Sequence, residues 1–202
     1  MVSSYGYMNH QSDQYYIARV LAGETNAFSF LVARYQNLVY TVVYRVVRNR
    51  EVAEEVAQDT FIKAYKSLSS YRGEAKFSTW LYTIAYRKSL DAIKKEKHVM
   101  STTLIEEISE GEVGLVNDAL SNLQAKERKK IISDSIMQLP EDEAVIVTLY
   151  YFEEKSIKEI TKIVGLTMDN VKIKLFRSRK KLYSMLKHHI LPEINSNNGR
   201  AI

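Results

Sequence analysis

The chain has 202 residues, which is long enough for one large domain or two small helical domains, and it carries a formal net charge of +5. It contains no cysteine, which excludes disulfide scaffolds, cysteine-ligated zinc and thiol catalysis, and favours a reducing compartment. Only 7 glycines and 2 prolines interrupt apolar residues that recur three and four positions apart. This pattern predicts an almost entirely α-helical protein.

The N-terminal half is predicted to be a helical bundle. Residues 1–24 read as a polar tail followed by the start of the first helix. Dense apolar patterns then predict helices over residues 27–47 and 51–68, packed as an antiparallel pair across a short connection. A third helix is expected to begin near Ser78 and to end at Lys95.

A linker is expected to follow, over residues 96–126. It is acidic, lacks strong periodicity and contains Gly111 and Gly114, so it should be flexible. The second folded unit is predicted over residues 127–190, and residues 191–202 form a polar tail. The expected fold class is therefore all-α, with two small helical domains joined by a flexible acidic linker.

Helix boundaries in the second unit have clear local signals. Pro140 suits the first turn of a helix, where its missing N–H costs nothing. Ser156 and Glu159 have the spacing of a capping box, Gly165 suits the left-handed end of the short helix that follows, and Thr167 can cap the next one.

The short helix that ends at Gly165 and the helix that begins after Thr167 have the spacing of a helix-turn-helix. Ile160, Val164 and Leu166 would fill the angle between them, and Val171 would anchor the second helix on the first. Such a helix can enter the major groove of DNA. Its candidate base-reading side chains are Asn170, Lys172, Ile173, Phe176 and Arg177, and its candidate phosphate contacts are Arg179, Lys180 and Lys181. The alternative is a capped helical hairpin with a solvated basic face.

Aromatic and basic residues alternate between Tyr71 and Lys95. Aromatic rings can stack on unpaired bases, and neighbouring cations can follow a phosphate backbone, so this segment suits single-stranded nucleic acid. The alternative, at least as favourable for Trp80, is that Phe77, Trp80 and Ile84 are ordinary core residues.

Other functional classes find little support. The 4 histidines lack the spacing of a metal site, and no glycine-rich phosphate loop or nucleophile with its base is visible. We expect no enzyme activity, cofactor, metal or small-molecule substrate. With neither a signal sequence nor a long apolar run, the chain is expected to be cytoplasmic.

Two motifs, in the expected order, resemble a known family. The runs from Ala53 to Tyr65 and from Tyr71 to Asp91 resemble region 2 of extracytoplasmic-function (ECF) sigma factors, of the sigma-70 family. The segment from Leu139 through the helix-turn-helix to Leu182 resembles their region 4. The resemblance covers residues 25–95 and 127–187.

The resemblance implies that the chain binds core RNA polymerase and directs promoter-specific initiation. It assigns Glu55, Gln58, Asp59, Phe61, Ile62 and Lys63 to the clamp helices of the polymerase β′ subunit. For capture of the −10 element it implies Tyr71, Arg72, Lys76, Phe77, Trp80, Thr83, Tyr86 and Arg87. The helix-turn-helix residues named above would read the −35 element.

One position departs from the family, because Arg87 stands where many members carry Asn. Arginine prefers guanine or phosphate, so the base preference at that position does not transfer. The resemblance also implies contact with the β flap, a monomeric free state and an anti-sigma factor as a partner. The competing hypothesis is a stand-alone helix-turn-helix regulator that binds operators as a dimer.

Overall fold

The computed structural model describes residues 11–96 and 125–190, so the predictions for the two tails and for most of the acidic linker lie outside the described residues. Within the described part, every regular element is a helix, which confirms the all-α fold class. No described helix is both long and apolar enough to cross a lipid bilayer.

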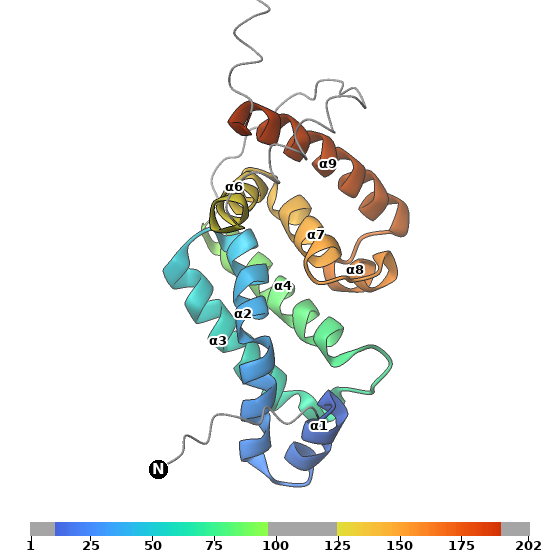
Figure 1. The fold of residues 1–202 in the computed structure, drawn as a ribbon. Coiled ribbons are helices and arrows are strands. Elements are labelled where there is room, and N and C mark those ends of the chain that lie inside the picture. Colours follow the sequence, from blue (N-terminus) through green and yellow to red (C-terminus); the bar gives the residue numbers. More distant parts are fainter. Residues whose placement is uncertain (1–10, 97–124, 191–202) are drawn as a thin grey trace, which may run out of the picture.

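The N-terminal half is built on helix α2 (Phe28–Val47), which lies against α3 (Arg50–Lys66) and α4 (Phe77–Glu96) (Figure 1). The predicted helices over 27–47 and 51–68 agree with α2 and α3 to within about two residues at each end. Asn49 accepts a hydrogen bond from the Val52 amide at 3.1 Å and so caps α3. Their shared core contains Leu31, Val39, Val42, Val43, Ala53, Leu81 and Ala85.

A separate first helix, α1 (Asp13–Leu21), was missed by the sequence prediction, which treated residues 1–24 as a tail and the start of one helix. Tyr16, Ile17 and Val20 of α1 are buried. Arg34 of α2 forms an ion pair with Asp13 at 2.5 Å. A nine-residue helix is marginal alone, and these contacts with the rest of the fold stabilise it.

The C-terminal half contains α6 (Ala125–Met137), α7 (Glu141–Tyr151), α8 (Ile157–Val164) and α9 (Met168–Ile190). The capping box is present, with Glu159 N donating to Ser156 Oγ at 3.2 Å and Ser156 N donating to the Glu159 carboxylate at 3.0 Å. Gly165 ends α8 with φ of 72°, as predicted. Pro140 lies one position earlier than predicted, because it caps α7 from outside the first turn.

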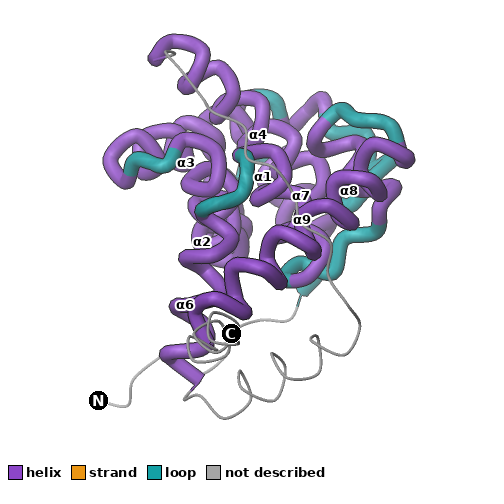
Figure 2. Tube along the Cα trace, turned by 90° about the horizontal axis from the view of Figure 1, so that it is seen from above, coloured by secondary structure: helices purple, strands orange, loops and turns teal. Residues whose placement is uncertain are grey.

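The two halves are in direct contact. Helix α4 packs against α8, and α2 packs against α7, so the N-terminal bundle and the helix-turn-helix lie side by side (Figure 2). Arg45 of α2 donates to the Ser133 carbonyl at 3.0 Å, and Lys155 donates to Ser78 Oγ of α4 at 2.7 Å. The sequence did not determine whether the halves would touch.

Candidate nucleic-acid interface

The helix-turn-helix has the geometry that its spacing predicted. Ile160, Val164 and Val171 are buried between α8 and α9. The Asn170 amide donates to Thr167 Oγ1 at 3.3 Å, so Thr167 caps α9. This packing fixes α9 to α8 and leaves the opposite face of the first turns of α9 open to solvent.

The side chains at the start of α9 form an exposed surface of mixed chemistry. Ile173 is 47% exposed and Phe176 is 52% exposed, so two large apolar side chains lie among the basic ones. Lys172 Nζ lies 3.9 Å from the Asp169 carboxylate, and both side chains are exposed. All five predicted base readers are exposed: Asn170, Lys172, Ile173, Phe176 and Arg177.

The three predicted phosphate contacts differ in their surroundings. Arg179 is exposed, whereas Lys180 is partly buried, with its ammonium 5.1 Å from the centre of the Phe176 ring. Lys181 Nζ lies 3.1 Å from the buried carboxylate of Glu143, to which Ser178 also donates a hydrogen bond. Lys181 therefore holds α9 on α7 in this structure.

Sequence reasoning missed Glu143. The signal was a carboxylate at the start of an otherwise apolar run, Glu143-Ala-Val-Ile-Val147. A buried carboxylate needs a cation or hydrogen-bond donors, and the basic helix α9 supplies both.

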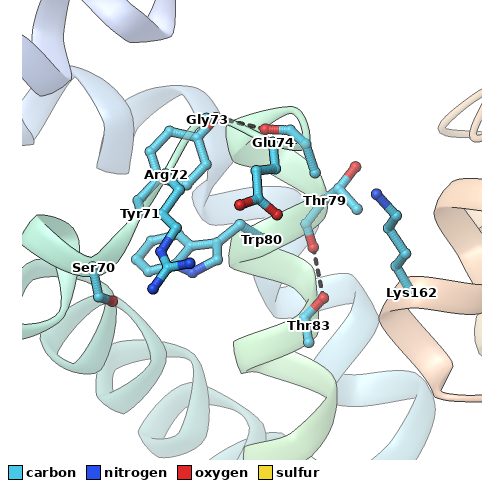
Figure 3. Close-up of a pocket in the computed structure, with 10 residues that line it drawn as sticks. Ser70, Tyr71, Arg72, Gly73, Glu74, Thr79, Trp80, Thr83 and Lys162 are labelled. Carbon is cyan, nitrogen blue, oxygen red and sulfur yellow. Dashed lines mark hydrogen bonds between the residues drawn. The ribbon is translucent and has the colours of Figure 1, made fainter.

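A cavity of about 380 Å³ opens between the loop after α3 and the start of α4 (Figure 3). Tyr71 forms one wall, where its hydroxyl donates to the Ala75 carbonyl at 2.6 Å and its ring lies 5.4 Å from that of Trp80. Lys162 approaches the cavity from α8. Aromatic walls with cations around them suit one unpaired base and its phosphate. The cavity is lined by Ser70, Tyr71, Arg72, Gly73, Glu74, Ala75, Thr79, Trp80, Thr83 and Lys162.

The structure brings four of the eight predicted −10 residues to this cavity. Tyr71, Arg72, Trp80 and Thr83 line it. Lys76, in the loop just before α4, and Arg87, on α4, are exposed.

Two predicted −10 residues are buried instead. Phe77 is 2% exposed and contacts the rings of Tyr35, Tyr71 and Trp80, as in the alternative interpretation of an ordinary core residue. Tyr86 is 5% exposed, and this burial, together with the charges of Asp142 and Glu141, raises its pKa to about 12. Neither side chain offers a surface to DNA in this conformation.

The exposed face of α3 carries the residues predicted to contact polymerase. Glu55, Gln58, Asp59, Ile62 and Lys63 are exposed, and Phe61 is half-buried. An open groove of about 710 Å³ runs between α3 and α4, and Lys88 Nζ lies 2.8 Å from the Asp59 carboxylate in it. The groove is lined by Val52, Glu55, Val56, Asp59, Lys88, Asp91 and Ala92.

The described residues combine an all-helical fold with an aromatic-lined cavity and an exposed helix-turn-helix, and the matches to family models define the class as transcription initiation factors. Sigma-70 region 2 matches residues 31–99, and Sigma-70 region 4 matches residues 129–182. The chain belongs to the ECF sigma factors of the sigma-70 family, which direct RNA polymerase to promoters.

Two relatives illustrate this membership. The ECF RNA polymerase sigma-E factor of Haemophilus influenzae is 33% identical over 187 residues, covering 90% of this chain and 96% of the relative. The ECF RNA polymerase sigma factor SigW of Bacillus subtilis is 33% identical over 181 residues, covering 85% of this chain and 95% of the relative.

Solved structures share the fold. The sigma factor RpoE of Bartonella quintana, in complex with the anti-sigma factor NepR, matches with a TM-score of 0.59 and 17% identity over 79% of this chain and 96% of that chain. CnrH, in complex with the cytosolic domain of CnrY, matches with a TM-score of 0.55 and 21% identity. The match covers 88% of this chain and 98% of the CnrH chain.

Proposed function

We propose that this sigma factor reads promoters with two separate surfaces: the cavity at the start of α4 takes an unpaired base of the −10 element, and the start of α9 reads the −35 element. The observation that carries this proposal is the presence, on one chain, of an aromatic-lined cavity and an exposed recognition helix.

At the −10 element, Tyr71 and Trp80 would stack on or enclose a base that has left the duplex. Arg72, Lys76 and Arg87 would hold the phosphates on either side of it. A base bound in the cavity cannot pair with its partner, so binding there favours the melted duplex. This is how a chain without enzyme activity can help to open DNA.

At the −35 element, α9 would lie in the major groove of intact duplex. Lys172 and Arg177 can donate to guanine, Asn170 can pair with adenine, and Ile173 or Phe176 can contact a thymine methyl group. Arg179 would contact the backbone and fix the depth of the helix in the groove.

The exposed face of α3 would dock on the clamp helices of the polymerase β′ subunit, through Glu55, Gln58 and Asp59 and the apolar Phe61 and Ile62. Ile62 is 52% exposed beside these polar groups, which is typical of a docking surface. The C-terminal half would contact the β flap. We assign region 2 to residues 25–95, the linker to 96–126 and region 4 to 127–190.

An anti-sigma factor is the expected regulator. RpoE of Bartonella quintana is bound to an anti-sigma factor in its crystal structure, and the likeness of this chain to it supports the proposal. The chain would act as a monomer in the cytoplasm, with polymerase. No cofactor enters this mechanism. Family membership argues against a stand-alone dimeric regulator.

A fluorescent base analogue tests the cavity directly. We would place 2-aminopurine at successive positions of the −10 non-template strand and add holoenzyme formed with this chain. Its fluorescence should rise when the base unstacks from DNA and fall when it stacks on Trp80, so one position should respond differently from its neighbours. Trp80→Ala should abolish that difference. A position-independent response in the wild-type holoenzyme would contradict the proposal.

A further inference from the structure

An open groove of about 560 Å³ lies where α2, α6 and the end of α7 meet (Figure 1). It shares no lining residue with the −10 cavity or with the groove between α3 and α4. No step of the proposed function uses it. Its volume falls within the range of roughly 300–1,000 Å³ that is typical of small-molecule sites.

One part of the groove wall is apolar. Leu38 of α2 and Ile132 of α6 are half-buried there, and Phe152, which follows α7, is 55% exposed. A molecule that covers these three side chains would remove their apolar surface from water, which favours binding in proportion to the area covered. The groove can therefore hold the apolar body of a ligand.

Another part of the wall is basic. Arg45 of α2 and Arg128 and Lys129 of α6 line the groove. Among the described residues, Glu153 is the only acidic side chain that lines it. Burial raises the pKa of the Glu153 carboxyl, so its ionised form is less favoured than that of an exposed glutamate. The lining side chains thus carry a net positive charge.

Arg45 gives the clearest indication that the ligand is an anion. The residue is only 8% exposed, and its guanidinium donates to the Ser133 carbonyl at 3.0 Å and to Ser133 Oγ at 3.3 Å. It forms no ion pair with any described residue, and its Nε has no acceptor among them. Burial lowers the pKa of Arg45 despite the nearby charge of Asp134. A buried guanidinium without a carboxylate partner is costly, and an anion in the groove would reduce that cost.

We infer that this groove binds a small amphiphilic anion, with a carboxylate head and an apolar body. The head would pair with the cations of Arg45, Arg128 and Lys129, since a guanidinium offers two parallel N–H donors to a carboxylate. The body would lie on the apolar wall described above. The two parts of the wall together select this chemistry, because a bare anion would leave the apolar wall in water and a cationic amphiphile would meet three like charges.

Titration calorimetry of the full chain with decanoate tests the site, and it requires neither polymerase nor DNA. Decanoate, kept below its critical micelle concentration, should bind saturably with one site per chain and a Kd of about 100 µM or lower. It should also raise the Tm as its concentration increases. Two comparison ligands separate the parts of the wall: decyltrimethylammonium has the same apolar body with a cationic head, and inorganic phosphate has no apolar body. Each should bind at least about tenfold more weakly.

Charge variants locate the head of the ligand. Arg45→Gln removes the buried charge and should weaken decanoate binding by about tenfold or more, because charge-assisted hydrogen bonds to the carboxylate are lost. Lys129→Gln, at an exposed position that lines the groove, should weaken binding by about threefold. The matched control is Lys130→Gln, the same change at the next position of α6, which is exposed and does not line the groove. Its affinity should equal that of the wild-type chain.

Leu38→Trp tests the apolar wall without changing any charge, so it does not depend on the folding of the Arg45 variant. The larger side chain, at a half-buried position that lines the groove, should fill the space that the apolar body needs. Decanoate binding should then be lost. Circular dichroism and thermal unfolding must show that each variant keeps its helices.

Three results would overturn the inference. Equal binding of decanoate and decyltrimethylammonium would mean that the groove takes any apolar molecule, and equal binding of decanoate and phosphate would mean a simple anion site. Decanoate binding that persists in both Leu38→Trp and Lys129→Gln would place the ligand elsewhere on the chain. Absence of saturable decanoate binding up to about 1 mM would contradict the site altogether.

Discussion

Lys181 of α9 and Glu143 of α7 form an ion pair at 3.1 Å, in which the carboxylate is 8% exposed and the lysine side chain is 21% exposed. The pair links the recognition helix to the core of region 4. Lys181, which the sequence predicts to contact a DNA phosphate, therefore also stabilises the fold.

Lys181→Ala should destabilise the C-terminal half, because it leaves the Glu143 carboxylate buried with only the Ser178 hydroxyl as donor. We expect a loss of about 2 kcal/mol or more in the free energy of unfolding, measured by chemical denaturation. Lys180→Ala is the matched control and should cost less than about 1 kcal/mol. Equal stability of the two variants would mean that Lys181 is only a phosphate contact.

Lys172 and Arg179 should separate base reading from backbone contact. Lys172→Ala should change the −35 sequences that are used, at a cost of ~1–3 kcal/mol at one base pair. Arg179→Ala should weaken all −35 sequences alike and lower the salt slope by about one unit. Selection of active promoters from a library randomised at −35 measures both. If the two variants select the wild-type sequences equally, α9 is oriented differently in the groove.

Asp59 should contribute to polymerase binding. Asp59→Lys reverses a charge that is 56% exposed in the α3–α4 groove and repels Lys88. We expect at least about a tenfold loss of affinity for core polymerase in a binding titration, with unchanged helical content. Glu54→Lys makes the same change on α3 at a position that does not line the groove, and it should bind normally. An equal loss in both variants would indicate a general charge effect.

Gly165 should be required for its backbone conformation, not for lack of space. Its φ is +72°, and a Cβ atom added there would meet no atom within 4 Å. Gly165→Ala should therefore cost about 1–2 kcal/mol of stability in thermal unfolding through the left-handed conformation alone. Gly165→Asn should cost less, since asparagine tolerates this region better. A neutral alanine variant would show that the turn relaxes.

Local signals explain why so much of the fold was predictable. The apolar spacing of α2 and α3, the capping box of Ser156 and Glu159, and the glycine after α8 each act within a few residues of sequence. The same helical spacing predicted which side chains at the start of α9 are exposed.

What was missed depends on contacts between distant segments. Helix α1 is too short to be recognised without its packing on α2, and Glu143 looks like surface charge until Lys181 is placed beside it. The burial of Tyr86 and the Glu159–Thr79 contact depend on how the two halves meet. No periodicity within either half determines that arrangement.

Transcription with purified core polymerase tests the central claim most directly. This chain would be added to core enzyme with a promoter library randomised at both elements, and the transcripts would be sequenced. Our account predicts transcripts only with the chain present, from templates sharing one −10 and one −35 sequence. When Trp80→Ala and Lys172→Ala are combined, it predicts that the −10 preference weakens and that the −35 preference relaxes at one base pair. Sequence-specific binding of a dimer to palindromic DNA, with no stimulation of core polymerase, would contradict it.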